Sequence, residues 1–437
     1  MLISIVIPTR ERAELLRDAL AACTRIVDSQ IEIVVSDNAS LDETAATVAA
    51  NRDDRVRYVR TPQRVSMREN FEFGVSHARG DYVLVMGDDD APIPNQFPYL
   101  RTLLETRHPD TLTGSTVKYA WPGPGAQDSR GPVRLRRRSA YGSLIEVPGA
   151  QLRADLERDG AALGRYAPRI YGGLVSRRVI EELKAKAGQL FMASWPDTYF
   201  SFAAPSVVER HLIVEHPFFV VGWGLRSDGV ALALWKRGDG RGEIFDKFLT
   251  ETRLDPIVDV IPGASSLQFG IFSHFASANR HAYGGQLPTK YEREFERVIR
   301  SLDEFDPPRR QAAVAALARF ASQEGLPPQL CDETQLLNRC APAVKAPKKR
   351  IRGRVRNYVF FDRVFVDLDG GPKTDVDAAA AAYERLLGTK QGRGNWPPFV
   401  AWAHLVGRAI PMVMWRSYAR RFDAQRTLGA SNEDRPS

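Results

Sequence analysis

The chain has 437 residues, 43% apolar and 26% charged, which is typical of a soluble globular protein with room for two or three domains. Its net charge of +8 is uneven, because residues 341–437 hold 18 Lys and Arg against 9 Asp and Glu. The three cysteines lie far apart, which excludes a cysteine metal site. The apolar N-terminus has no basic region or cleavage site, so we expect a first strand there, no signal peptide and a cytoplasmic protein with reduced thiols.

The first 90 residues alternate short apolar runs with helical patterns. Strands are predicted at 3–7, 31–35, 56–59 and 82–86, and helices between them at 13–23, 41–50 and 67–78. Repeated strand and helix units predict right-handed crossovers and an α/β fold with a mostly parallel sheet.

Polar residues follow the first, second and fourth of these strands: Pro8-Thr9-Arg10, Asp37 and Asp88-Asp89-Asp90, respectively. Because the carboxyl ends of parallel strands meet at one edge of a sheet, we expect these side chains to surround one ligand. Carboxylate oxygens suit Mg²⁺ or Mn²⁺, which one or two carboxylates typically hold together with phosphate oxygens. The plainer alternatives are a solvated acidic turn and, for Asp37, a turn residue bonded to its own backbone.

Three stretches, residues 8–9, 34–42 and 78–90, together resemble glycosyltransferase family 2. The resemblance is strong over about residues 1–95 and weaker to about 230. It implies the Rossmann-like GT-A fold and a nucleoside-diphosphate sugar as donor. Asp37 would contact the base, and the acidic motif would bind the ribose and the divalent metal.

The same resemblance places other residues near the nucleotide: Pro8, Thr9, Arg10, Asp88 and Arg68. For Arg68 the alternative is an exposed helical arginine. The family pattern commonly has Asp where this chain has Gly87. Alignment by the strand end makes Asp89 the leading metal ligand, whereas alignment by Asp-x-Asp spacing selects Asp88 and Asp90, and both stay open.

The region from residue 96 to 230 is predicted to complete this domain. It contains an expected strand at 111–118, a Gly- and Pro-rich loop at 121–138 that is either a flap or a surface loop, and a helix after Ser176. Asp197 opens a further helix, where the resembling family has its catalytic base. Helix electrostatics alone would also favour an acidic residue in that first turn.

Two aromatic residues beside Asp197, Trp195 and Tyr199, are expected either to contact a sugar or to pack in the core. Arg226 lies in a Gly-rich turn, and similar turns in the resembling family close the donor site over the diphosphate. The Gln-x-x-Arg-Trp motif of processive members is absent from the sequence, which disfavours processive polymerisation.

Helices are predicted after residue 240, at 244–252, 265–281, 291–302 and 311–322. In the basic C-terminal part, residues 345–358 combine Lys and Arg with aromatic residues, and residues 396–421 have Trp near both ends of an interrupted apolar run. An anionic membrane surface explains both better than nucleic acid does, and packing on the globular body is the alternative for the second.

Together the sequence predicts a GT-A domain at 1–230, with a nucleotide half at 1–95 and an acceptor half at 96–230, then a helical region at 231–340 and a basic segment at 341–437. The resemblance implies an inverting, metal-dependent hexosyltransferase. We expect it to act on a glycan or lipid-linked acceptor in cell-surface polysaccharide or glycolipid assembly. We also expect the protein to be cytoplasmic and peripheral to the membrane. Two other classes stay open: a sugar-nucleotide-binding protein without transferase activity, and a nucleotidyltransferase on a similar sheet.

Overall fold

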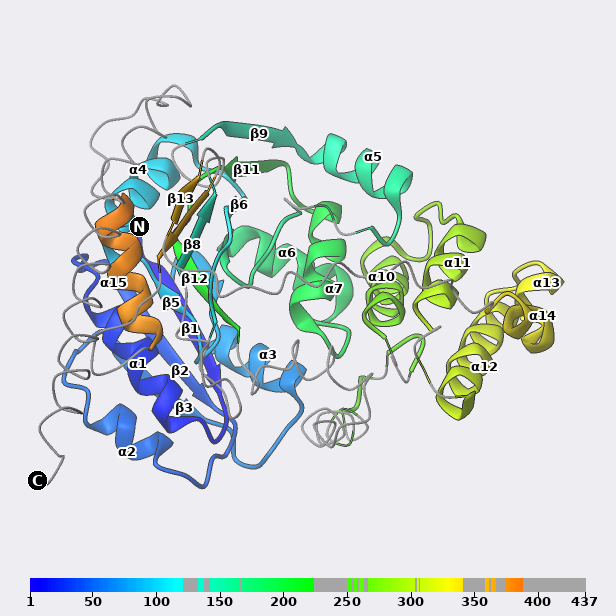
Figure 1. The fold of residues 1–437 in the computed structure, drawn as a ribbon, viewed down its shortest axis with the longest axis horizontal. Coiled ribbons are helices and arrows are strands. Elements are labelled where there is room, and N and C mark those ends of the chain that lie inside the picture. Colours follow the sequence, from blue (N-terminus) through cyan, green and yellow to red (C-terminus); the bar gives the residue numbers. More distant parts are fainter. Residues whose placement is uncertain are drawn as a thin grey trace, which may run out of the picture.

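The computed structural model describes residues 1–120, 133–136, 142–162, 164, 167–223, 250, 252, 255–257, 259–262, 266–302, 305, 307–340, 358–360, 363–366 and 375–387. Within this part of the chain an eight-stranded sheet has the order β3-β2-β1-β4-β10-β6-β11-β9 (Figure 1). Its strands are β1 (Ile3–Thr9), β2 (Ile31–Asp37), β3 (Val56–Arg60), β4 (Tyr82–Val85), β6 (Thr111–Gly114), β9 (Leu144–Pro148), β10 (Gly173–Ser176) and β11 (Arg210–Val214).

Most neighbouring strands of this sheet are parallel. β1 pairs in parallel with β2 and β4, β2 with β3, and β6 with β11, whereas β10 and β9 run antiparallel to their neighbours. The predicted α/β fold with a mostly parallel sheet is therefore confirmed, and β1 to β4 are the four strands predicted within residues 1–90.

Alternate side chains of the central strands enter two different cores. Ile5 and Leu84 pack with α1 (Ala13–Thr24) and α4 (Phe97–Arg107) on one face. Val6 and Val83 face the opposite core. Its helices are α3 (Met67–His77), α6 (Arg177–Ala187) and α7 (Pro196–Ala203). Burial on both faces is what a parallel sheet requires, and it leaves the strand ends as the edge open to ligands.

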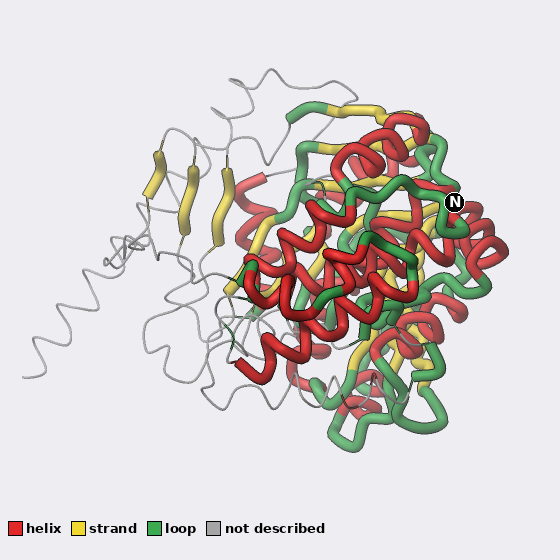
Figure 2. The backbone as a smooth tube through the Cα atoms, turned by 90° about the vertical axis from the view of Figure 1, so that its right-hand side faces the viewer, coloured by secondary structure: helices red, strands yellow, loops and turns green. Residues whose placement is uncertain are grey.

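A second sheet among the described strands has the order β13-β14-β8-β7-β12-β5, and Figure 2 shows its outer strands at one side of the molecule. The bounds are β5 (Ala91–Pro92), β7 (Val117–Ala120), β8 (Val133–Arg136), β12 (Phe219–Trp223), β13 (Tyr358–Phe360) and β14 (Arg363–Val366). The prediction of one strand over 111–118 is wrong. The chain leaves the main sheet at Ser115, whose N–H donates to the carbonyls of Val214 and His216, and continues as β7 in the second sheet.

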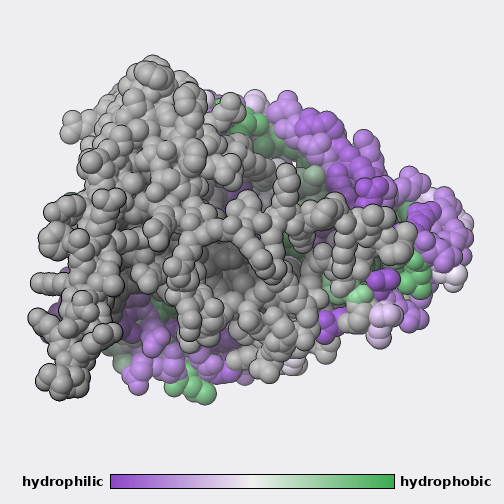
Figure 3. Space-filling view, in the orientation of Figure 1, coloured by the Kyte–Doolittle hydropathy of each residue, from purple (hydrophilic) through white to green (hydrophobic). Residues whose placement is uncertain are grey.

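The helical region follows at the right of Figure 1, in agreement with the predicted helices at 265–281, 291–302 and 311–322. Its helices are α10 (Leu267–Tyr283), α11 (Tyr291–Ser301), α12 (Pro307–Gln323), α13 (Pro328–Cys331) and α14 (Glu333–Asn338). Buried Phe272 and Phe295 belong to the same core cluster as Val6, so these helices share a core with the sheet. Figure 3 shows mostly hydrophilic side chains over the outer end of the region.

The remaining described helices are shorter or lie at the edges of the body: α2 (Thr44–Ala49), η1 (Pro94–Gln96), α5 (Gly149–Asp159), η3 (Ala204–Ser206) and α15 (Val376–Leu387). Helix α15 comes from the C-terminal segment and lies beside α1 (Figure 1). Arg25 of α1 pairs with Asp377 at 2.7 Å and with Glu384, and the buried Tyr383 donates its hydroxyl to Lys118 O at 3.2 Å. This part of the C-terminal segment therefore packs on the body.

The predicted membrane-binding stretches, 345–358 and 396–421, lie outside the described residues except for Tyr358. The predicted loop at 121–138 is described only for its last part, as β8, and the predicted helix at 244–252 only at residues 250 and 252. Within the described ranges, no helix has the length and apolar character that crossing a membrane requires.

Candidate active site

The acidic motif and the end of β1 meet at the carboxyl edge of the main sheet, as predicted. Asp88 is buried and accepts hydrogen bonds from Thr9 Oγ1 at 2.7 Å and from Arg12 Nη1 at 3.0 Å. Pro8 and Arg10 are partly buried on either side of Thr9. The contact joins residues 79 positions apart, and only the parallel pairing of β1 with β4 brings them together.

Asp90 is fixed from three directions. It accepts the N–H of Gly222 in β12 at 2.7 Å, the N–H of Gly87 at 3.1 Å and the hydroxyl of Tyr171 at 2.5 Å. A Cβ atom added to Gly87 would lie 2.5 Å from that hydroxyl and 2.7 Å from Asp89 Oδ1, closer than real Cβ contacts. The Tyr171 hydroxyl thus accounts for glycine at the position where the resembling family commonly has Asp.

The three carboxylates repel one another in a buried setting. Burial, with repulsion from Asp90 and Asp88, raises the pKa of Asp89 well above its ordinary value. Burial also raises the pKa of Asp90 to about 6, although its three donors partly oppose the shift. A divalent cation would relieve both effects.

A metal ion fits this motif only with help from the substrate. Among the described residues, no group of three or more His, Cys, Asp or Glu side chains is arranged to hold a metal by itself. Metals of the Mg²⁺ type need only one or two protein carboxylates when diphosphate oxygens complete the shell. Both oxygens of Asp88 and both of Asp90 accept hydrogen bonds from protein donors, so these contacts fix the shape of the motif.

Asp37 lies fully buried at the end of β2, beside the same edge. Its Oδ1 accepts the N–H of Ser40 at 3.0 Å, and its Oδ2 accepts the hydroxyl of Tyr58 at 2.5 Å and lies 4.0 Å from Arg60 Nε. The turn bond that was the alternative for Asp37 is therefore present. The Tyr58 and Arg60 contacts from β3 hold the second oxygen as well.

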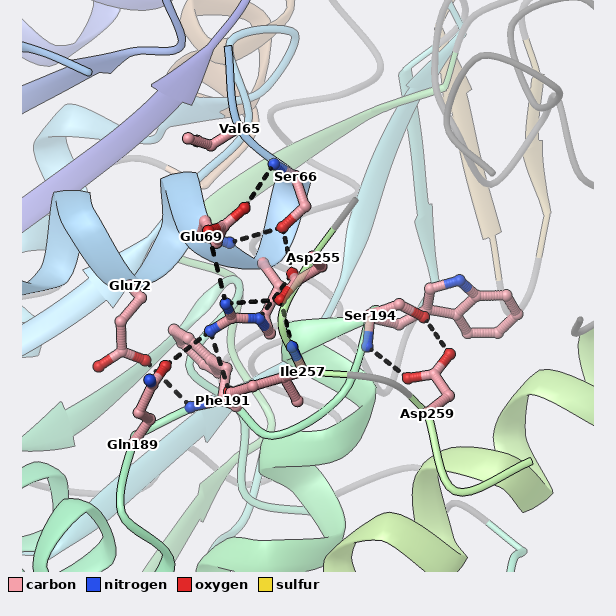
Figure 4. A network of polar contacts seen from close by, with 12 residues as sticks. Val65, Ser66, Glu69, Glu72, Gln189, Phe191, Ser194, Asp255, Ile257 and Asp259 are labelled. Carbon is pink, nitrogen blue, oxygen red and sulfur yellow. Dashed lines mark hydrogen bonds and ion pairs between the residues drawn. The ribbon is translucent and has the colours of Figure 1, made fainter. Parts of the chain in front are cut away.

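Arg68 is buried, with 2% of its side chain exposed, so the alternative of an exposed helical arginine is wrong. Its guanidinium donates to both oxygens of Asp255, at 2.7 and 2.8 Å, and to Gln189 Oε1 at 2.8 Å (Figure 4). The structure therefore places Arg68 in an internal ion pair.

Asp197 lies in the first turn of α7, half-buried, and burial raises its pKa. Together with Asp90 and Asp89 it raises the pKa of the Tyr171 hydroxyl. Trp195 stacks on His274 with ring centroids 4.9 Å apart. Since Tyr199 is also fully buried, both aromatic residues belong to the core.

Sequence reasoning missed three residues at this site: Arg12, Tyr58 and Tyr171. A signal existed for Tyr58, which stands near the end of the third parallel strand, and for Arg12, which follows Thr9 closely. Nothing local marks Tyr171, since its partner Asp90 is 81 positions away. Arg226 lies outside the described residues.

The described chain thus has a mostly parallel α/β sheet with Asp37 and an acidic motif at its carboxyl edge, where open α/β sheets bind ligands. Residues 4–150 match the family model described as glycosyl transferase family 2.

Two curated relatives match shorter stretches. Abequosyltransferase RfbV of Salmonella typhimurium is 35% identical over 112 residues, which are 24% of this chain and 34% of that protein. Glycosyltransferase GlyG of Streptococcus pneumoniae serotype 4 is 24% identical over 120 residues, 27% of this chain and 40% of that protein. The chain thus spans well under half the length of these relatives.

Solved structures resemble the chain more distantly. S. aureus TarS 1-349 in complex with UDP-GlcNAc has a TM-score of 0.42 and 14% identity, covering 78% of this chain and 90% of that one. The mannosyltransferase PcManGT of Pyrobaculum calidifontis, in complex with GDP-Man and Mn²⁺, has a TM-score of 0.37 and 16% identity, covering 78% and 86%. Both scores are too low to establish a shared fold.

Proposed function

We propose that the chain is a glycosyltransferase that moves a sugar from a nucleoside diphosphate to an acceptor hydroxyl. One observation carries the proposal: the buried carboxylates of the acidic motif and the half-buried Asp197 both act on the Tyr171 hydroxyl, which donates to Asp90. A donor bound along the edge would present its anomeric carbon between them.

Each residue has a role that follows from its environment. Asp197 takes the proton of the acceptor hydroxyl as the oxygen attacks the anomeric carbon, and its raised pKa makes it a stronger base than an exposed Asp. Direct attack from that side inverts the anomeric carbon. Asp37 accepts a ring N–H of the base, and Arg12, together with Arg226, provides positive charge for the diphosphate.

The metal belongs to the same proposal. Bound Mg²⁺ or Mn²⁺ would neutralise charge on the departing diphosphate. Alignment by the strand end makes Asp89 its leading ligand, and Asp88 and Asp90 shape the motif through their bonds to Thr9 and Tyr171.

The acceptor is a glycan or a lipid-linked sugar, in the assembly of a cell-surface polysaccharide or glycolipid. Support comes from the sugar-transferring relatives and from the basic segments at 345–358 and 396–421, which would hold the protein on an anionic membrane surface. Flotation with anionic liposomes at physiological salt tests the membrane part, and absence of binding would remove it.

Calorimetric titration with UDP, GDP, CDP and dTDP, with and without Mn²⁺, tests the donor site. We expect one nucleotide to bind in a Mn²⁺-dependent manner, and Asp89→Ala to abolish that dependence while the control Asp155→Ala on α5 does not. No binding of any nucleotide would refute the proposal. If a nucleotide binds and Asp197→Asn leaves every measurable function intact, the chain is instead a binding protein without transferase activity.

A further inference from the structure

Two buried aspartates four positions apart, Asp255 and Asp259, hold the beginnings of two helices at the candidate site (Figure 4). We infer that these two aspartates, together called the strap below, position the candidate base Asp197 relative to the nucleotide half. The inference rests on the proposed function, because it concerns the base of that reaction.

The first end of the strap binds the start of α3. Asp255 accepts two bonds from Arg68, at 2.7 and 2.8 Å, and a third from the hydroxyl of Ser66. Ser66 is the N-cap of α3 and forms a reciprocal capping box with Glu69. The start of the helix is thereby locked to the strap by charge-assisted hydrogen bonds, which are stronger than neutral ones.

The start of α3 is in turn bonded to the nucleotide edge. Asn38, which follows Asp37 directly, accepts the N–H of Val65 at 2.9 Å and donates its amide to Val65 O at 2.8 Å. Val65 precedes Ser66, so an unbroken series of hydrogen bonds runs from the end of β2 to Asp255. Any shift of the strap must therefore strain this series.

The second end of the strap binds the start of α7. Asp259 accepts the N–H of Ser194 at 2.8 Å and its hydroxyl at 2.5 Å. The next amide, Trp195 N–H, donates to His274 Nε2 at 2.8 Å, so His274 carries its proton on Nδ1 and donates it to Gly270 O. Nothing but Pro196 separates these anchored amides from Asp197.

Asp255 binds the start of α3, in the nucleotide half, and Asp259 binds the start of α7, in the acceptor half. Arg68 also donates to Gln189 Oε1 and Phe191 O, close before Ser194, which adds a second connection across the same gap. A displacement of about 1 Å at a reacting group can slow a reaction about 100-fold. The strap is thus placed to affect turnover through the position of Asp197.

The test compares Asp259→Asn and Ser194→Ala with a matched control, Asp110→Asn. Asp110 is also buried and also accepts two backbone amides, those of Glu209 and Arg210, but it lies at the amino edge of β6 and β11, away from the site. Asp259→Asn keeps the shape of the side chain, and Ser194→Ala removes only a hydroxyl, so a folded protein remains available in at least one of the two.

Two readouts separate positioning from stability. Hydrogen exchange in the ligand-free protein should rise at least about tenfold at the amides of residues 194–199 in Asp259→Asn, and not in the control. The donor for the kinetic assay is the sugar derivative of the nucleotide that binds in calorimetry. With it, kcat should fall about 10- to 100-fold in the strap variants, while the dissociation constant of the nucleotide with Mn²⁺ changes less than about twofold.

Each result decides something. If hydrogen exchange at residues 194–199 is unchanged, or if folded Asp259→Asn has a normal kcat, the positioning role of the strap is refuted. The proposed function is then unaffected. Failure of the wild-type chain to bind any nucleotide overturns the proposed function and the catalytic role of the strap together. A loss of kcat in Asp110→Asn equal to that in Asp259→Asn would show that general destabilisation, and not positioning, is responsible.

Discussion

Replacing Gly87 by Ala should damage the acidic motif, and removing the Tyr171 hydroxyl should repair part of that damage. The added methyl would meet Tyr171 Oη at 2.5 Å, Asp89 Oδ1 at 2.7 Å and Asp90 Oδ2 at 3.2 Å. Gly87 has no positive φ in the structure, so the effect comes from crowding and not from the backbone. The first atom that must move is therefore the Tyr171 hydroxyl.

The magnitudes follow from the contacts. Overpacking at a buried position costs about 1–3 kcal/mol, so Gly87→Ala alone should lower the free energy of unfolding by about 2 kcal/mol. Tyr171→Phe removes a hydrogen bond to a buried carboxylate that keeps two N–H donors, a loss of about 1.5 kcal/mol. In the double variant the nearest obstacle is gone, so the total should be about 1 kcal/mol smaller than the sum of the single effects.

Urea unfolding of the four proteins in one buffer without metal measures this coupling. Gly87→Ala in a Tyr82→Phe background is the matched control, because the Tyr82 hydroxyl donates to Pro109 O and not to the motif. Additivity of Gly87→Ala and Tyr171→Phe within about 0.3 kcal/mol would refute the explanation given for the glycine. Coupling as large in the control background would refute it as well.

Three further outcomes are expected. Turnover should fall as the pH drops through the pKa of Asp197, which burial raises above the ordinary 3.8, because the base must be ionised; Asp197→Asn should abolish turnover in a pH–rate profile but leave nucleotide binding in calorimetry. Asp255→Asn leaves the buried Arg68 without its counter-charge and should lower the free energy of unfolding in urea by about 3–5 kcal/mol. Tyr383→Ala should cost about 3–5 kcal/mol in the same assay if α15 is part of the body, and close to nothing if residues 341–437 fold separately.

The meeting of polar residues at the sheet edge was predictable because topology alone places them there. Parallel strands bring their carboxyl ends to one edge, so Thr9, Asp37 and the acidic motif had to meet once β1, β2 and β4 were recognised. Which of the three aspartates would bind a metal depends on side-chain contacts, which the strand pattern does not determine. The sequence cannot show that Asp88 bonds to Thr9 and Arg12 while Asp90 faces Tyr171.

Arg68 shows where the pattern misleads. Its position in the first turn of α3, close to the nucleotide edge, is compatible with an arginine for phosphate. Its guanidinium is instead paired with Asp255, 187 positions later in the chain, and both side chains are buried. Long-range ion pairs of this kind leave no local signal, since neither partner lies in a motif.

The direction of α7, and with it the position of Asp197, is set by packing contacts. The sequence alone therefore does not show where an acceptor would meet Asp197. Trp195 can lie against α10 only because residue 270 is glycine, where a Cβ would come within 2.1 Å of the indole. His274 and Asp259 then fix the two amides before Asp197. The residues proposed to bind the donor lie at strand ends, whereas the placement of the proposed base Asp197 depends on contacts between segments 65 and 79 positions apart. Changes at Gly270, His274 or the strap should therefore alter acceptor use while the donor nucleotide stays the same.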